Sequence, residues 1–168
     1  DDQDPFFPAV PTNRFQAQME YLAEHYFPCP LQEAFERLKH DDLRENTVVV
    51  TFDDGYRDNY VNAFPSLQRF GIPATIFLAT GAIGSGKMIW HDRVFRAFRK
   101  TKVTALEDFR GIKKSLLVRR LEERRVAQAR VLQILWELPA EERLDRIHQL
   151  EERLQIDDEI TAAEVMLG

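Results

Sequence analysis

The sequence predicts an α/β fold that carries an additional charged helical region. Val48–Phe52 and Ala74–Thr80 are short apolar runs without polar alternation, which is typical of strands covered on both faces of a parallel sheet. Between them, Asp58 or Asn59 can cap a helix that continues to about Phe70. A strand, a helix and a second strand within about thirty residues predict a βαβ unit whose strands are parallel neighbours.

Two shorter helices are expected before this unit. Asn13 is a good N-cap for a helix that runs to about His25. Its inward face is expected to carry Phe15, Met19 and Leu22. A second helix is expected from Leu31 to about His40, and its apolar face holds Leu31, Phe35 and Leu38. The residues before the first helix, Asp1–Pro11, are polar and rich in proline and predict an extended lead-in.

A heavily charged region follows from Trp90 to about Ile156. Its pattern predicts helices over His91–Lys100 and Lys113–Leu138, and a third helix that has Pro139 in its first turn. The third helix is expected to bury a stripe formed by Leu144, Ile147, Leu150 and Leu154. Because no heptad pattern is sustained, these helices are interpreted as an insertion that packs on the α/β part, not as a coiled coil.

Three segments are therefore predicted along the chain. Residues 1–89 form the first part of an α/β domain, and residues 90–160 form a helical insertion within it. Residues 161–168 begin a further helix, since Thr161 and Glu164 have the spacing of a capping box. A helix start with less than two turns behind it, together with only two parallel strands, predicts a truncated domain.

Composition excludes several classes of protein. Hydrophobic residues make up 44% of the 168 residues and the net charge is −5, so the chain has material for a core but no basic field for nucleic acid. No apolar run approaches the ~20 residues that a membrane span requires. Cys29 is the only cysteine, which rules out intrachain disulfides and cysteine-rich zinc sites.

The chemistry is expected at Asp53 and Asp54, which directly follow the first predicted strand. Ligand sites of α/β folds lie at the carboxyl ends of strands, and Gly55 permits a tight turn there. Two adjacent carboxylates on such a turn can divide their roles, one binding a cation while the other moves a proton. A hairpin turn centred on Asp54 and Gly55 is the structural alternative. An aspartate phosphotransferase loop fails because Phe52 stands where a second aspartate is needed, and an EF-hand fails because its glycine comes too early.

The sequence around this motif resembles a known family. The segments Val50–Tyr60, Asn62–Pro65 and Gly71–Phe77 are similar to the polysaccharide deacetylases related to the nodulation chitooligosaccharide deacetylases. An Ala-Thr-Gly turn at residues 79–81 and the Trp-His-Asp-Arg stretch at residues 90–93 resemble the subgroup associated with bacterial exopolysaccharide and exosortase systems. The resemblance runs from about Pro5 onward. It is specific in residues 48–81 and loose in the helical insertion.

This resemblance implies a distorted (β/α) barrel, of which the chain is the first part. It implies a hydrolase that acts on carbon–nitrogen bonds other than peptide bonds and removes acetyl groups from an acetylated polysaccharide. Asp53 takes the place of the general base, and Asp54 that of a ligand to zinc or a similar divalent metal. Tyr56 is expected to contact the sugar. The resemblance points to bacterial exopolysaccharide metabolism, in the cytoplasm or the cell envelope, without fixing the location.

The chain also departs from the family pattern. It contains no His-x-x-x-His motif for the two histidine ligands, so we expect this fragment alone to be inactive and to bind metal weakly or not at all. Of its four histidines, His91 is the best substitute because it follows the second strand. Hydrogen bonding at a helix start explains it more simply. His25, His40 and His148 are interpreted as surface or boundary residues.

Two other functions stay open on the sequence. Gly81–Lys87 has the spacing of a phosphate-binding loop, but Met88 stands where a serine or threonine should hold magnesium, so a glycine-rich connector is the simpler interpretation. The chain could instead be a non-catalytic remnant that binds carbohydrate or a protein partner, with Phe6, Phe7, Tyr56 and Trp90 available for stacking. Exposed sheet edges of a truncated barrel predict self-association or pairing with a missing C-terminal half.

Overall fold

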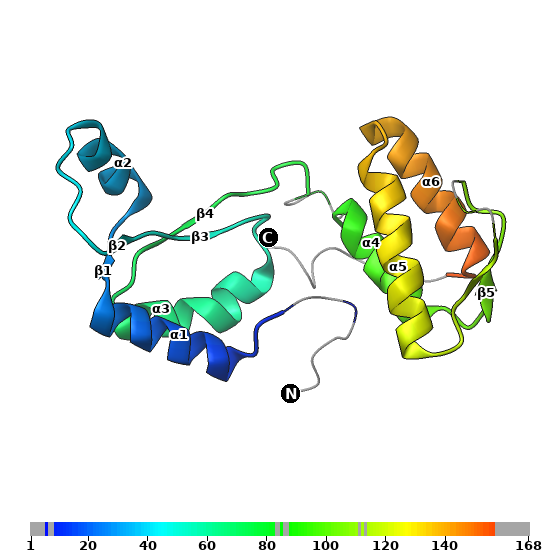
Figure 1. Ribbon diagram of the computed structural model, residues 1–168, viewed down its shortest axis with the longest axis horizontal. Coiled ribbons are helices and arrows are strands. Elements are labelled where there is room, and N and C mark those ends of the chain that lie inside the picture. The colour runs from blue at the N-terminus through cyan, green and yellow to red at the C-terminus, as the bar shows by residue number, and fades with distance from the viewer. Residues whose placement is uncertain are drawn as a thin grey trace. The chain divides into compact units, whose positions relative to one another are not determined.

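The computed structural model describes residues 6, 9–82, 85, 88–110, 112 and 114–156. These residues form two compact units (Figure 1). The α/β unit contains residues 10–82 and Ser85, and the helical unit contains Phe6, Ala9 and the described residues from Met88 to Ile156. Each unit has its own hydrophobic core. Among the described residues, no helix combines the length and the apolar character needed to span a membrane.

Two pairs of parallel strands form the sheet elements of the α/β unit. Strand β1 (Phe27–Pro28) pairs with β2 (Thr47–Val48), and β3 (Val50–Phe52) pairs with β4 (Ala74–Ile76). The continuous strand predicted over residues 48–52 is therefore wrong, because Val49 falls between a ladder to β1 and a ladder to β4. The parallel βαβ unit itself is confirmed, with Val50 opposite Ala74.

The second predicted strand is shorter than expected. It ends at Ile76 and not at Thr80, although two further backbone bonds keep the chain beside the end of β3. The Phe77 N–H donates to the Phe52 carbonyl at 2.8 Å, and the Ala79 N–H donates to the Asp54 carbonyl at 3.2 Å. The segment thus stays attached to the turn that follows β3 without continuing the regular ladder.

The helices of this unit follow the sequence prediction with small corrections. Helix α1 (Thr12–His25) begins before Asn13, with Pro11 at its N-cap, so the predicted cap is wrong. Helix α2 (Leu31–Lys39) has the predicted extent. The crossover helix starts with a π-helical turn, η1 (Asn59–Ala63), and continues as α3 (Phe64–Phe70). Pro65 cannot donate a backbone hydrogen bond and crowds the preceding turn, which explains the widened turn before it.

The core of the α/β unit is small and lies between the helices and the sheet. Met19, Leu67 and Ile72 are its largest buried residues, and α1 packs against α3. The predicted apolar face of α2 is not buried, since Phe35 is 56% exposed and Leu38 is 62% exposed. Helical spacing marked that face correctly, but nothing among the described residues covers it.

The helical unit holds helices α4 (Trp90–Lys100), α5 (Leu121–Trp136) and α6 (Ala140–Arg153). The helix predicted from Lys113 begins eight residues late, because residues 116–117 form strand β6, which pairs antiparallel with β5 (Ala105–Leu106). The Glu123 carboxylate fixes the real start of α5 by accepting the backbone N–H groups of Arg119 and Arg120 at 2.9 and 3.1 Å.

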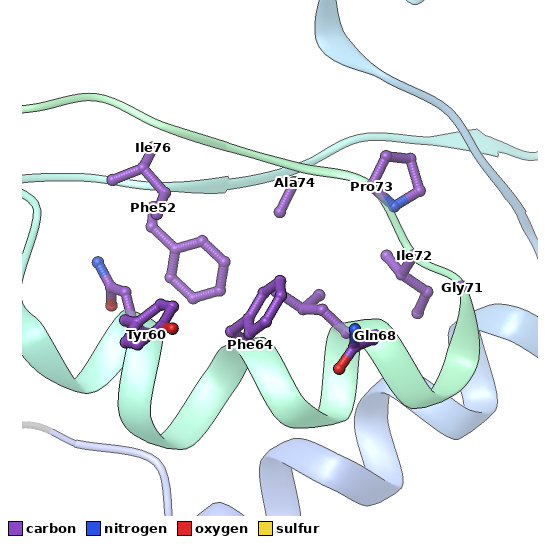
Figure 2. A pocket seen from close by; sticks show the side chains of 11 residues that line it. Phe52, Tyr60, Phe64, Gln68, Gly71, Ile72, Pro73, Ala74 and Ile76 are labelled. Carbon is purple, nitrogen blue, oxygen red and sulfur yellow. The ribbon is translucent and has the colours of Figure 1, made fainter.

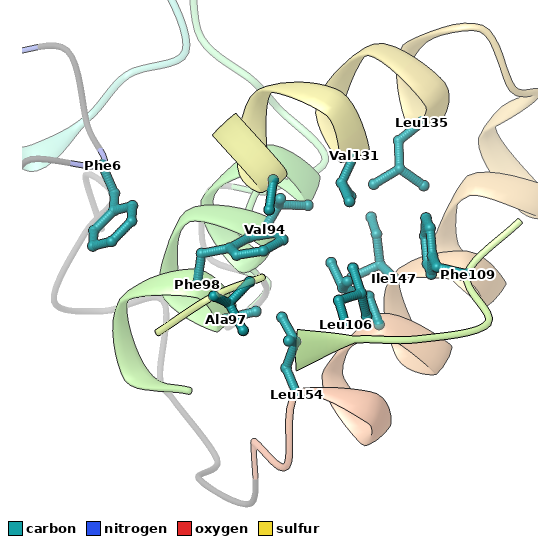
Figure 3. Packing of buried hydrophobic residues seen from close by; sticks show 13 residues of the cluster. Phe6, Val94, Ala97, Phe98, Leu106, Phe109, Val131, Leu135, Ile147 and Leu154 are labelled. Atoms are coloured by element: carbon teal, nitrogen blue, oxygen red, sulfur yellow. The ribbon is translucent and has the colours of Figure 1, made fainter. Parts of the chain in front are cut away.

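A single apolar cluster joins the elements of the helical unit (Figure 3). Val94, Phe98, Ile147 and Leu150 are fully buried in it, as the helical spacing predicts, and so is Leu135. Two residues depart from expectation. Leu144 is 46% exposed and does not belong to the buried stripe. Phe6, expected in an extended lead-in, is buried in this cluster, and its carbonyl accepts the Gln128 side-chain N–H at 3.1 Å.

An ion pair with two hydrogen bonds ties α4 to α6. The Arg93 guanidinium donates to both carboxylate oxygens of Glu151, at 3.0 and 2.5 Å. The two side chains are 20% and 17% exposed, so the pair is partly shielded from solvent. Such paired geometry orients the helices in a way that a single contact does not.

Candidate functional site

The two aspartates occupy a strained turn at the carboxyl end of β3. The Gly55 N–H donates to the Asp53 carbonyl at 2.9 Å, which closes a three-residue turn centred on Asp54. Asp54 has a φ of +69° and Gly55 a φ of +74°. A side chain at positive φ costs about 1–3 kcal/mol, and such strain is concentrated at functional sites. Asp41, Asn46, Asp108 and Gln155 also have positive φ, so the angle alone does not mark a site, and Asp54 differs from them in lying just after β3 at the end of a parallel pair.

The same turn separates the two carboxylates by environment. Asp53 is exposed, Asp54 is half-buried, and Gly55 is buried beneath them. The Ala79 N–H bond to the Asp54 carbonyl joins the turn to the segment that follows β4. Both aspartates thus lie where two parallel strands end, which is the usual position of ligand sites in parallel sheets. An exposed carboxylate beside a half-buried one can divide the roles of moving a proton and binding a cation.

Together the two carboxylates make only part of a metal site. No group of three His, Cys, Asp or Glu residues gathers in metal-binding geometry among residues that the structure describes. A catalytic zinc ion takes three protein ligands and keeps one position open. Asp54 fits as one ligand, but the described residues do not complete the set.

The four histidines belong to elements other than this turn. His25 ends α1, His40 follows α2 and His148 lies on α6, all three exposed, in agreement with the surface interpretation. His91 belongs to the helical unit, where its ring packs edge-on against Trp90 with centroids 5.5 Å apart. Its Nε2 lies 3.6 Å from an oxygen of Asp92. Its local partners are thus aromatic rings and a helix-start carboxylate.

Tyr56 follows the turn and is half-buried. Its carbonyl accepts the Asn59 N–H at 3.1 Å, which starts the crossover helix directly after the aspartates. The contact with sugar that was expected for Tyr56 stays a prediction. The glycine loop is described only at Gly81, Ala82 and Ser85, so the phosphate-loop interpretation falls largely outside the described residues.

Sequence reasoning missed an apolar groove of about 640 Å³ between the β3–β4 pair and the crossover helix. Figure 2 shows Phe52 and Ile76 above it, with Tyr60, Phe64 and Gln68 in a row along the helix below. The Tyr60 and Phe64 rings are stacked, with centroids 5.6 Å apart. Tyr60, Phe64 and Gln68 follow one another at intervals of four residues, and this spacing alone could have predicted that they share one face of a helix.

One buried donor faces this groove. Asn59 lines it and is only 9% exposed, and its side-chain nitrogen Nδ2 has no hydrogen-bond partner among the described residues. A buried amide without an acceptor costs about 1–3 kcal/mol. Ile76 at 37% and Phe64 at 44% exposure leave further apolar surface open beside it. The groove thus has the character of a packing surface whose partner is not among the described residues.

Comparison with known proteins identifies relatives of this chain. The family model described as polysaccharide deacetylase matches residues 40–123, which is half of the chain. YxkH of Bacillus subtilis (strain 168), which carries the name of a polysaccharide deacetylase, is 42% identical over 77 residues, covering 45% of this chain and 28% of that protein. No solved structure matches the chain significantly.

Two staphylococcal proteins also match, and both are named poly-beta-1,6-N-acetyl-D-glucosamine N-deacetylase. The protein of Staphylococcus epidermidis is 35% identical over 78 residues, covering 46% of this chain and 27% of the relative. The protein of Staphylococcus aureus (strain MSSA476) is 32% identical over 77 residues, covering 45% of this chain and 27% of the relative. The matched stretch therefore spans less than a third of each of these relatives.

Proposed function

This chain belongs to the polysaccharide deacetylase family, and from that premise we propose that it is part of an enzyme that hydrolyses acetyl groups from an acetylated polysaccharide. The observation that carries the proposal is the strained aspartate turn at the end of β3, with an exposed Asp53 beside a half-buried Asp54. The relatives' names favour N-acetylated hexosamine polymers as the substrate class.

In the proposed reaction, Asp53 acts as the base. Its exposed carboxylate accepts a proton from a water molecule while the water oxygen attacks the acetyl carbonyl carbon. The bond between that carbon and the sugar nitrogen then breaks, the nitrogen takes up a proton, and acetate and a free amine leave.

Asp54 is proposed as one ligand of a divalent metal, most simply zinc. A metal bound there would polarise the acetyl carbonyl and lower the pKa of a bound water. Its other ligands must come from outside the described residues, since these hold no third ligand near the turn. We therefore expect the 168-residue chain alone to bind zinc weakly and to release little or no acetate.

A (β/α) barrel is the proposed architecture of the complete domain. The outer edge of β4 pairs with no strand among the described residues, and the groove beside it exposes apolar side chains and the unpartnered Asn59 amide. A further strand on β4 with its helix beside α3 would cover both, because parallel sheets are normally covered on both faces. Without such a strand, the outer edge of β4 favours pairing with another chain.

Acetate release tests the proposed reaction. The assay compares this chain with a protein extended to the length of its relatives, using N-acetylglucosamine oligomers with added zinc or chelator. In the extended protein, Asp53→Asn and Asp54→Asn should each lower the rate at least a hundredfold, whereas Asp58→Asn, an exposed neighbour, should leave it unchanged. Full activity of Asp53→Asn would contradict its role as the base. Acetate release by the 168-residue chain itself would contradict the expectation that further metal ligands are needed.

The alternative function is a non-catalytic binding module. The incomplete ligand set among the described residues favours it for the isolated chain, and the open β4 edge favours self-association or pairing with a separate C-terminal half. Analytical ultracentrifugation across micromolar concentrations decides this point. A compact monomer at every concentration would count against self-association.

A further inference from the structure

A pair of tryptophans marks a second surface of interest, in the helical unit. Trp136 is the last residue of α5 and is 73% exposed, although large aromatic side chains are usually mostly buried. Its ring lies 5.9 Å from the ring of Trp90, the first residue of α4. These are the only two tryptophans of the chain, and folding has placed them side by side on one surface.

Arg143, from the first turn of α6, holds the Trp90 ring in place. Its guanidinium carbon lies 4.7 Å from the centre of the Trp90 ring, a cation–π distance. The same guanidinium donates to the carbonyls of Leu135 and Leu138 at 2.9 and 2.8 Å, at the end of α5. One side chain thus connects the ends of three helices that pack against one another. Trp90, against which Trp136 lies, is therefore fixed before any ligand arrives, which lowers the entropy cost of binding.

The packing of the helical unit does not account for this exposure. The core of the unit is complete without Trp136, since its fully buried residues come from α4, α5, α6 and the β5–β6 pair. Leu135, the neighbour of Trp136, already fills the core position at the end of α5. Trp90 is half-buried and packs against the core, so the exposed ring of the pair is Trp136. An exposed aromatic ring beside a fixed aromatic partner is typical of a binding surface.

We propose that the exposed Trp136 ring, supported by Trp90 at an interplanar angle of 56°, is a stacking platform for the sugar rings of the polysaccharide, in a different unit from the aspartate turn. The proposal rests on the proposed function for its ligand class. A pyranose ring presents an apolar face of C–H groups and a rim of hydroxyl and acetamido groups. The open Trp136 ring matches the apolar face. The helical insertion then has a role of its own, which is to hold the polymer chain.

Intrinsic fluorescence gives a direct test, because both tryptophans of the chain belong to the platform. The 168-residue chain is titrated with a tetramer of N-acetylglucosamine, and a saturable change in tryptophan emission is expected. Calorimetry then compares variants. Trp136→Ala should weaken binding about tenfold, since it removes the exposed ring, and Trp136→Phe should weaken it less. Val126→Ala is the matched control, because Val126 is 69% exposed on the same helix and should change nothing.

The design separates this proposal from the proposed enzyme. Binding is also measured in a chain that carries Asp53→Asn and Asp54→Asn, where the platform should bind the tetramer unchanged. If acetate release fails in every protein but the tetramer binds, the deacetylase proposal falls and the platform stands. No saturable signal, or equal affinity in Trp136→Ala, would overturn the platform. So would tryptophan emission that depends on protein concentration and not on the sugar, since a second copy would then cover the surface.

Discussion

The backbone angle of Asp54 makes a quantitative prediction about the proposed metal ligand. With φ at +69°, Asp54 lies in a region that costs a side-chain-bearing residue about 1–2 kcal/mol. Glycine escapes this cost but loses about 0.4–1 kcal/mol through the greater freedom of the unfolded chain. Asp54→Gly should therefore be nearly neutral for stability. Asp54→Ala keeps the strained backbone angle and lacks the short polar side chain that helps aspartate to adopt a positive φ. It should therefore be less stable than Asp54→Gly by about 1 kcal/mol.

Cys29 provides the assay for this difference. It is the only cysteine, it lies in the same α/β unit, and it is 2% exposed, so a thiol reagent reaches it only when the unit opens. In moderate urea, the labelling rate follows the population of the open unit. A difference of about 1 kcal/mol corresponds to about a fivefold change in that population. Asp54→Ala should thus be labelled about five times faster than Asp54→Gly.

Asp53 supplies the matched control, because it sits beside Asp54 in the same turn without a positive φ. There the usual order should hold, with the alanine variant more stable than the glycine variant by about 0.4–1 kcal/mol. The two positions should therefore give opposite orders of labelling rate. If Asp54→Ala is labelled no faster than Asp54→Gly, the turn does not store the strain assigned to it.

Further predictions concern the two cores and the buried thiol. Glu151→Gln should destabilise the helical unit by about 2 kcal/mol, since the partly buried Arg93 loses its charged partner. The measurement is urea unfolding followed by tryptophan fluorescence, and an unchanged midpoint would mean that the ion pair adds nothing to stability. In the same assay, Leu150→Ala should lower the free energy of unfolding by about 3 kcal/mol, because it leaves a cavity in the core. Leu144→Ala should lower it by less than about 0.5 kcal/mol, because Leu144 is largely exposed, and equal losses would contradict the burial pattern. Burial, with a smaller effect of a nearby carboxylate, raises the pKa of the Cys29 thiol. As pH rises, the unfolded chain therefore loses the thiol proton before the folded chain does. Stability of the α/β unit should then fall above the unfolded thiol pKa of about 8.5. Urea midpoints measured by circular dichroism should show this fall, and Cys29→Ala should remove it.

Local patterns in the sequence determined most of the elements. Helical spacing placed α1, α2, α4 and α6 to within a residue or two, because a helix buries one face and its apolar residues must recur along it. Two apolar runs around a capped helix predicted the parallel βαβ unit, which the β3–β4 pair confirms. The neighbouring aspartates needed no folding to be recognised, since adjacency in sequence already brings two carboxylates to one strand end.

Tertiary structure decided which of these faces are covered. The apolar residues Phe35, Leu38 and Leu144 have the same spacing as buried ones, yet they are exposed, because burial depends on a partner element and not on the helix alone. The start of α5 likewise depended on residues 116–117 finding a strand partner in β5. A competing long-range pairing of this kind overrides local helix preference.

The features that bear on function also needed the fold. The positive φ of Asp54 arises from a turn attached to the segment after β4, and the groove arises from two strands and a helix meeting. Trp90 and Trp136 are far apart in sequence and come together only because α4 and α5 pack side by side. The sequence alone determined which residues can carry chemistry. The packing of distant segments decided which of them are strained, exposed or paired, because those properties depend on contacts that no local pattern encodes.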